Sequence, residues 1–98
     1  WRQSEPGASN LPKLVFEKHF IRCANKLIKG SPDLDPKLEK ILLLLKENPF
    51  NPSLKTHALS GNLKGKYACS LTHDLRIIFK LTSETIHLLD IGTHDEVY

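Results

Sequence analysis

The chain has 98 residues, of which 40% are hydrophobic and 26% are charged, and its formal net charge is +3. A chain of this length forms one domain and buries roughly 60–70% of its unfolded surface. The longest apolar run, Ile41 to Leu45, is too short to cross a bilayer, and the first eleven residues contain no apolar block that would indicate a signal peptide. We therefore expect a cytoplasmic protein with no membrane segment.

Charge is distributed unevenly along the chain. Residues 1–31 and 49–82 each carry a net charge of +4, whereas residues 83–98 carry −4. The two basic segments could bind a polyanion such as RNA or the ribosome surface, and they could bind an acidic protein equally well. The two cysteines, Cys23 and Cys69, fall in a predicted helix and a predicted strand, so we expect buried thiols in a reducing compartment and no disulfide.

The first quarter of the chain predicts an arm, a strand and a helix. Residues 1–10 are polar and are predicted to form a flexible arm. Residues 11–16 contain a short apolar run that predicts a strand at a sheet edge, because Pro12 has no N–H to donate. The apolar residues that follow have helical spacing up to Gly30, a typical helix cap. Lysines and an arginine line the opposite face of this helix. This basic face is either simply solvated or binds phosphates or an acidic partner.

A second helix is predicted between two proline signals. Asp35 and Pro36 have the pattern of an N-cap followed by proline at the first helical position. Leucines and an isoleucine then follow the helical period until Asn48 and Pro49, where the helix should end. The connection between the two helices is short, so they should form an antiparallel hairpin.

The second half of the chain changes to strand patterns. Residues 50–65 predict a loop that contains His57, and strands are predicted over 66–71, 74–81 and 86–91. The order β-α-α-β-β-β predicts an α+β fold, in which an N-terminal helix hairpin packs on one face of a small four-stranded sheet, mixed or antiparallel. Residues 11–98 should form this single domain.

Strand 74–81 divides its side chains between two faces. Leu75, Ile77 and Phe79 alternate with Asp74, Arg76 and Lys80, so the apolar set should face the helices and the polar set should face away. Ser70 on the preceding strand should join the polar set. If the loop and the C-terminal segment fold over this face, three more residues join it: His57, His94 and Tyr98.

This polar set suits the cleavage of RNA by its own 2′-hydroxyl. That reaction needs a base for the hydroxyl proton, an acid for the leaving 5′-oxygen and a cation for the phosphorane charge. Histidine suits the proton steps and arginine suits the phosphate. The five histidines do not have the spacing of a known metal-ligand set, and we predict neither a metal nor a cofactor.

Three runs of sequence resemble the RelE/ParE toxin superfamily. They are Thr56–Gly65, Asp74–Phe79 and Ile91–Tyr98, the last of which is similar to the YafQ branch. The resemblance covers about residues 11–98, and it rests on the order and spacing of these runs together.

The resemblance implies a type II toxin with a RelE-like fold that cuts messenger RNA on the ribosome without a metal. It implies inhibition by a cognate antitoxin, and a heterotetramer with that antitoxin is one assembly that it allows. By position, His57 and Asp74 match catalytic residues of YafQ-like toxins, and His94 matches their histidine near the end of the chain. Tyr98 matches an aromatic residue beside that histidine, and Arg76 matches an arginine of the wider RelE group.

These matches give a working assignment. His94 is the general acid, His57 or Asp74 is the base, Arg76 binds the phosphate and Tyr98 stacks on a base of the RNA. YafQ-like enzymes can carry a further histidine at the position of Ser70, and serine cannot replace it in proton transfer near neutral pH. Four lysines from the basic segments are expected to bind RNA: Lys55, Lys64, Lys66 and Lys80.

Two other functions fit the same fold, because fold alone does not determine function. One is a ParE-like inhibitor of DNA gyrase without catalytic activity, and the other is a non-catalytic domain that binds an antitoxin. The set of His57, Asp74, Arg76 and His94 favours the nuclease, since a binding module has no need of two histidines that converge on an arginine.

Overall fold

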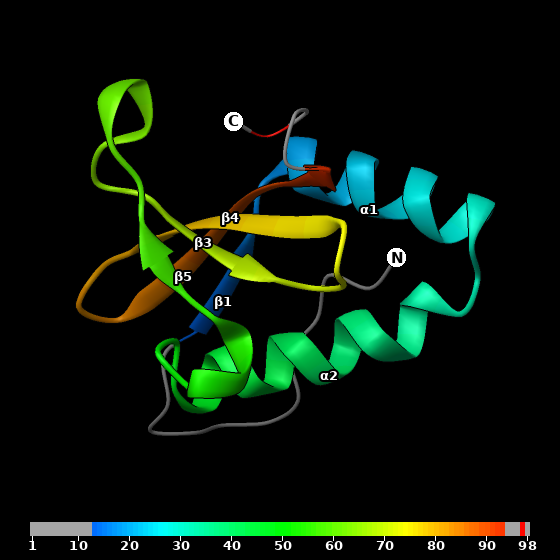
Figure 1. The fold of residues 1–98 in the computed structure, drawn as a ribbon, viewed down its shortest axis with the longest axis horizontal. Helices are drawn as coiled ribbons and strands as arrows, with labels where there is room; N and C mark the ends of the chain where they lie inside the picture. Colours follow the sequence, from blue (N-terminus) through cyan, green and yellow to red (C-terminus); the bar gives the residue numbers. More distant parts are fainter. Residues whose placement is uncertain (1–12, 94–96, 98) are drawn as a thin grey trace.

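The computed structural model describes residues 13–93 and residue 97. The two predicted helices are present as α1, Lys18–Gly30, and α2, Leu34–Glu47. They run in opposite directions and are joined by a short turn, as Figure 1 shows. The predicted N-cap at Asp35 was wrong by two residues: Asp33 occupies the N-cap position, and α2 begins at Leu34. Asn48 caps its C-terminus, as the Asn-Pro pair predicted.

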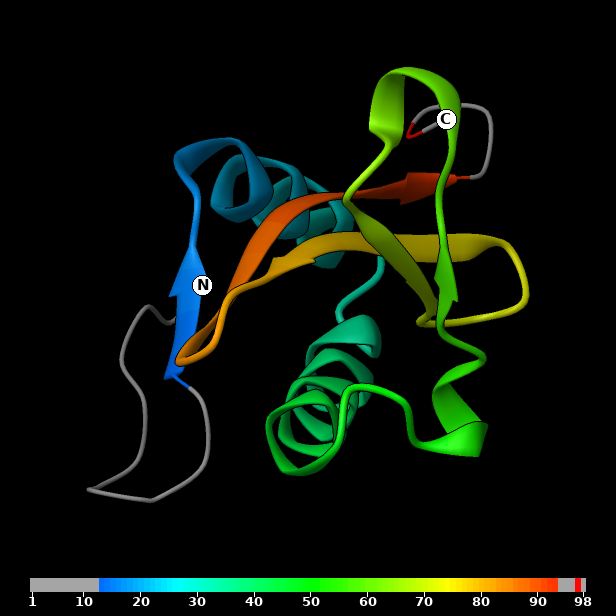
Figure 2. The same ribbon diagram turned by 90° about the vertical axis from the view of Figure 1, so that its left-hand side faces the viewer.

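The sheet has five strands in the order β1-β5-β4-β3-β2. The strands are β1 Lys13–Phe16, β2 His57–Ala58, β3 Tyr67–Ser70, β4 Leu75–Leu81 and β5 Thr85–Thr93. The first strand pairs parallel to β5, and the other neighbours are antiparallel. In Figure 2, β1 and β2 stand at opposite edges of the twisted sheet, so the predicted edge position of the first strand is confirmed.

The structure corrects two expectations about the strands. The sheet has five strands instead of four, because His57 and Ala58 in the predicted loop pair with β3. Strand β4 begins at Leu75, and Asp74 belongs to the turn before it. Two 3₁₀ turns, η1 at Pro52–Leu54 and η2 at Gly61–Leu63, lie on either side of β2. Neither α1 nor α2, the helices of the described residues, has the length and apolar character to span a bilayer.

Both helices pack on one face of the sheet, as predicted. Phe20 and Ala24 of α1 and Leu38, Leu42 and Leu45 of α2 are buried in one core cluster. The sheet contributes alternate residues to this cluster, namely Tyr67, Cys69, Leu71, Leu75, Ile77, Phe79, Ile86, Leu88 and Ile91. A second, smaller cluster consists of Ala68, Ile78 and Val97, with Leu59 and Leu89 packed against it.

Strand β5 contains a bulge that changes its alternation. Ile78 pairs with Asp90 and Phe79 pairs with Leu88, so Leu89 is an extra residue opposite β4. A bulge of this kind redirects the side chains next to it. Here the residues that face the helix-side core switch from even to odd numbers, from Ile86 and Leu88 to Ile91.

The buried thiol of Cys69 should make the protein less stable in alkali. Burial raises the pKa of Cys69 from 9.0 to about 12, although the Arg76 guanidinium acts in the opposite direction. Above pH 9 the unfolded chain releases the thiol proton while the native state retains it, so the free energy of unfolding should fall between pH 9 and pH 12. The contribution of Cys69 is at most about 1.4 kcal/mol for each pH unit.

Urea denaturation of the wild type and of Cys69→Ala at several pH values measures this contribution. The stability difference between the two proteins should shrink as the pH rises above 9, because the alanine variant has no thiol to ionise. Parallel pH profiles for the two proteins would contradict the prediction.

Candidate functional site

A row of paired residues crosses the sheet on the face that is turned away from the helix-side core. His57 of β2 pairs with Ala68, Ala68 pairs with Ile78, and Ile78 pairs with Asp90. Directly paired residues share a face of the sheet, so His57, Ala68 and Ile78 lie on one side, here called the open face, whereas the carboxylate of Asp90, next to the bulge, contacts His19 of α1. Val97 packs on Ala68 and Ile78, with only 8% of its surface exposed. The described end of the chain is thus anchored on the same face as His57.

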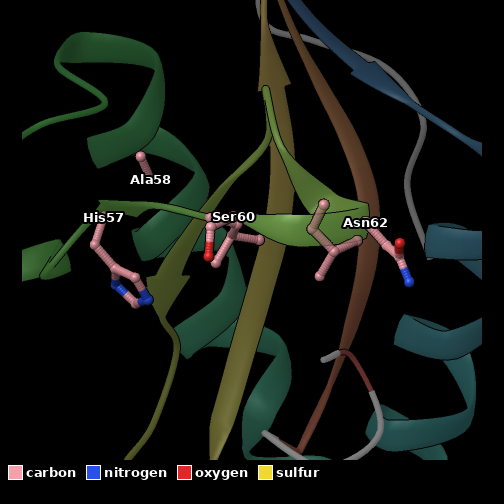
Figure 3. Close-up of a pocket in the computed structure, with 6 residues that line it drawn as sticks. His57, Ala58, Ser60 and Asn62 are labelled. Atoms are coloured by element: carbon pink, nitrogen blue, oxygen red, sulfur yellow. The ribbon is translucent and has the colours of Figure 1, made fainter.

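His57 is positioned by the short strand β2 and the turn before it. Figure 3 shows that His57 and Ser60 point to the same side of this segment, while Ala58 points to the other. Nδ1 of His57 lies 3.3 Å from the carbonyl oxygen of Lys55, whose backbone is left-handed with φ 53°. A carbonyl oxygen only accepts, so Nδ1 donates in this contact and Nε2 of the neutral ring is the acceptor nitrogen. The imidazole is exposed at the start of β2.

A cavity of about 410 Å³ lies beside His57. It is lined by residues of β2, η2 and their connection: His57, Ala58, Leu59, Ser60, Asn62 and Leu63. The walls are mixed polar and apolar, which suits a nucleoside that stacks on one side and forms hydrogen bonds on the other.

Arg76 lies on the open face, where β4 pairs it with Ser70. Its Nη1 donates to the carbonyl oxygens of Thr72 and His73, both at 3.0 Å, and to that of Leu75 at 3.1 Å. These bonds fix the guanidinium over the β3–β4 turn. The other nitrogens of the group make no hydrogen bond to a described residue, so they can bind a phosphate in the forked geometry of arginine.

Replacing Arg76 with alanine should destabilise the fold as well as impair the site. Loss of the hydrogen bonds to the turn should lower the free energy of unfolding by about 1–3 kcal/mol. Lys80→Ala is the matched control, since Lys80 is an exposed cation on the same face of the same strand, and its loss should cost less than about 0.5 kcal/mol. Urea denaturation of both variants measures the difference. Equal stabilities would show that the turn does not depend on Arg76.

Asp74 does not share the open face, contrary to the expectation from strand alternation. The reason is that the strand ends before it, and its exposed side chain belongs to the turn Leu71–Asp74. Asp74 lines a different cavity of about 590 Å³, between the C-terminal half of α1 and the ends of β4 and β5. His57 and Asp74 therefore line separate cavities, and the structure does not bring them together.

Of the four lysines expected to bind RNA, Lys64, Lys66 and Lys80 lie toward the end of the sheet that β2 runs to, and Lys55 lies before the other end of β2. Lys55 precedes β2, and Lys64 caps η2. Tyr67 pairs with Phe79, so Lys66 and Lys80 follow one residue further out on the two neighbouring strands. The remaining predicted site residues, His94 and Tyr98, lie outside the described residues.

Sequence analysis missed one cluster of ligand-type side chains. Nε2 of His19 lies 3.0 Å from Oδ1 of Asp90 and 3.6 Å from Sγ of Cys23. The signal that was available is the spacing of His19 and Cys23, four residues apart on one helix face. Asp90 could not be added to this pair from sequence, because the bulge in β5 determines its direction.

Comparisons with known proteins agree on a family. A sequence model described as the bacterial toxin YafQ of type II toxin–antitoxin systems matches residues 12–98. A metal-bound toxin from Helicobacter pylori is 31% identical in sequence, with a TM-score of 0.73, over 90% of this chain and 99% of that one. YafQ from Escherichia coli is similar in fold, with a TM-score of 0.76 and 24% identity over 89% of this chain and 98% of that one. The same values describe YafQ in the Escherichia coli DinJ–YafQ complex. A search of curated proteins found no match.

Proposed function

Because the chain belongs to the YafQ family of bacterial toxins of type II toxin–antitoxin systems, we propose that it cuts messenger RNA on the ribosome. The cut is made by acid–base chemistry of the chain's own side chains and stops translation. The protein acts in the cytoplasm, where its substrate is found.

The observation that carries this proposal is the packing of Val97 on the open face. Val97 covers Ala68 and Ile78, and Ala68 is the residue that pairs with His57. In sequence, Tyr98 follows Val97 directly and His94 precedes it by three residues. Val97 therefore lies on the same face of the sheet as His57, and we propose that His94 and Tyr98 act beside that histidine.

The proposed reaction uses two histidines and an arginine. Nε2 of His57 takes the proton of the 2′-hydroxyl, whose oxygen attacks the adjacent phosphorus. The bond from phosphorus to the 5′-oxygen breaks, and His94 gives that oxygen a proton. Arg76 stabilises the extra negative charge on the phosphorane, and Tyr98 stacks on a base. Of the two candidate bases, His57 is favoured over Asp74, because Asp74 lines the other cavity.

The basic residues of the open face support a polyanionic substrate. Arg76 and Lys80 come from β4, Lys66 directly precedes β3, and Lys55 and Lys64 come from the segments next to β2. Cations in this arrangement can bind the phosphates of an RNA backbone without contacts that depend on its sequence. We also propose a cognate antitoxin as partner, since YafQ of Escherichia coli has been solved in a complex with DinJ.

Primer extension in a purified translation system tests this function. The wild-type chain should produce new 5′ ends in a translated messenger RNA when ribosomes are present and none when they are absent. Equal cleavage of naked RNA would show a nuclease that does not depend on the ribosome. Uncut RNA with normal translation would overturn the proposal, and DNA supercoiling by gyrase would then be measured.

A further inference from the structure

We propose that His19, Cys23 and Asp90 form a binding site for Zn²⁺ that joins α1 to β5. The site goes beyond the proposed nuclease function and does not depend on it. Its three side chains offer one nitrogen, one sulfur and one oxygen, and these ligand atoms all lie within 4.8 Å of one another.

The distances are close to those of a formed zinc site. Zinc binds histidine nitrogen and carboxylate oxygen at about 2.0–2.2 Å and cysteine sulfur at about 2.3 Å, so ligand atoms at the corners of a tetrahedron are about 3.3–3.7 Å apart. Nε2 of His19 is 3.0 Å from the Asp90 carboxylate and 3.6 Å from the Cys23 sulfur. The Cys23 sulfur and the Asp90 carboxylate lie within 4.8 Å of each other, so binding of the ion requires side-chain rotation.

The fold holds the three ligands in place. His19 and Cys23 are four residues apart on α1 and flank Phe20, which is fully buried. The bulge in β5 directs Asp90 toward α1, and the same carboxylate oxygen, Oδ1, accepts a hydrogen bond of 2.8 Å from the backbone N–H of Ile91. That bond orients the carboxylate, as outer-shell partners do in metal sites.

The chemistry of the set selects the class of metal. Magnesium and calcium prefer oxygen ligands only, whereas a nitrogen, a thiolate and a carboxylate together suit zinc. The side chain of His19 is 60% exposed, so a water molecule can complete the tetrahedron. Binding displaces the thiol proton of Cys23 to solvent, and the ion then links the helix to the strand with the bulge.

The site is separate from the proposed catalytic residues. Asp90 lies three strands away from His57 in the sheet, a distance of roughly 14 Å at the usual strand spacing. The second cysteine, Cys69, is fully buried in the helix-side core and has no access to an ion at this site. Variants of the two sites can therefore be compared in one experiment.

Titration of the reduced, metal-free protein with Co²⁺, followed by absorption, tests the proposal. Cobalt bound to a thiolate gives a sulfur-to-metal charge-transfer band, which histidine and carboxylate ligands cannot produce. We expect this band in the wild type at one Co²⁺ per chain, its loss on addition of Zn²⁺, and its absence in Cys23→Ala. We also expect Zn²⁺, but not Mg²⁺, to raise the Tm of the wild type.

Two further variants and two controls complete the test. Asp90→Asn and His19→Gln preserve side-chain size and should weaken Zn²⁺ binding by more than about tenfold, the least that loss of an outer-shell partner costs. His57→Ala and His73→Ala remove exposed histidines elsewhere and should leave the band unchanged. A wild-type protein without the charge-transfer band, or Asp90→Asn with unchanged affinity, would overturn the proposal even if Cys23→Ala failed to fold.

Discussion

A chain in which His57 and His94 are both replaced with alanine should no longer cut messenger RNA. Each histidine is assigned one of the two proton transfers, and a positioned general acid or base typically accelerates such a step by about 10²–10⁴-fold. Each single variant should therefore lose at least about a hundredfold in cleavage rate. Primer extension on a translated messenger RNA, with and without ribosomes, measures the rates.

His73→Ala is the matched control for these variants. His73 is exposed on the β3–β4 turn. It is assigned neither of the two proton transfers, so its loss should leave the cleavage rate within a few-fold of the wild type. Circular dichroism should show that all variants are folded. If His94→Ala alone stays within a few-fold of the wild type, His94 is not the general acid.

Replacing Phe79 with alanine should cost about 3–5 kcal/mol of stability, the range for truncation of a fully buried aromatic residue. Phe79 is completely buried on the helix-side face of β4. Its ring also stacks on that of Tyr67, with centroids 5.8 Å apart. Because small domains are stable by only about 5–15 kcal/mol, the variant should be close to unfolding at 37 °C. Urea denaturation followed by circular dichroism measures the loss.

Phe50→Ala is the control for this prediction. Phe50 contacts the same Tyr67 edge to face, with centroids 5.5 Å apart, but 53% of its surface is exposed. Its loss should cost about 1 kcal/mol or less, because little apolar surface is buried with it. Similar losses in the two variants would mean that Phe79 is not central to the core.

The helices and the longer strands could be predicted from sequence because their apolar residues repeat with a fixed period. Phe20 and Ala24 are buried at helical spacing, and Cys69 and Ile77 are buried on the predicted strand face. Such periods depend on the average over many residues, so single boundaries are less secure. The pair Asp35–Pro36 resembled a helix start, but the turn from Ser31 to Leu34 closes earlier, where the backbone N–H of Leu34 donates to the carbonyl of Ser31.

Two features that shape the candidate sites have no periodic signal. Strand β2 is only two residues long, and its pairing with β3 depends on contacts that are distant in sequence. The bulge adds a single residue to β5 and redirects Asp90, which an alternating pattern cannot reveal. For these reasons sequence analysis placed His57 in a loop and did not find the cluster with His19 and Cys23. Arg76 was placed on the correct face because it lies inside a long, regular strand.

The position of β5 in the sheet has a consequence for synthesis of the protein. This strand is the last described strand to leave the ribosome, yet it lies between β1 and β4 and also packs against α1. Until it emerges, β1 has no partner strand, and the helix-side core lacks Ile86, Leu88 and Ile91. Contacts between such distant parts of a chain form slowly during folding. A nascent copy of this chain therefore lacks its complete sheet until residues 85–93 have left the ribosome.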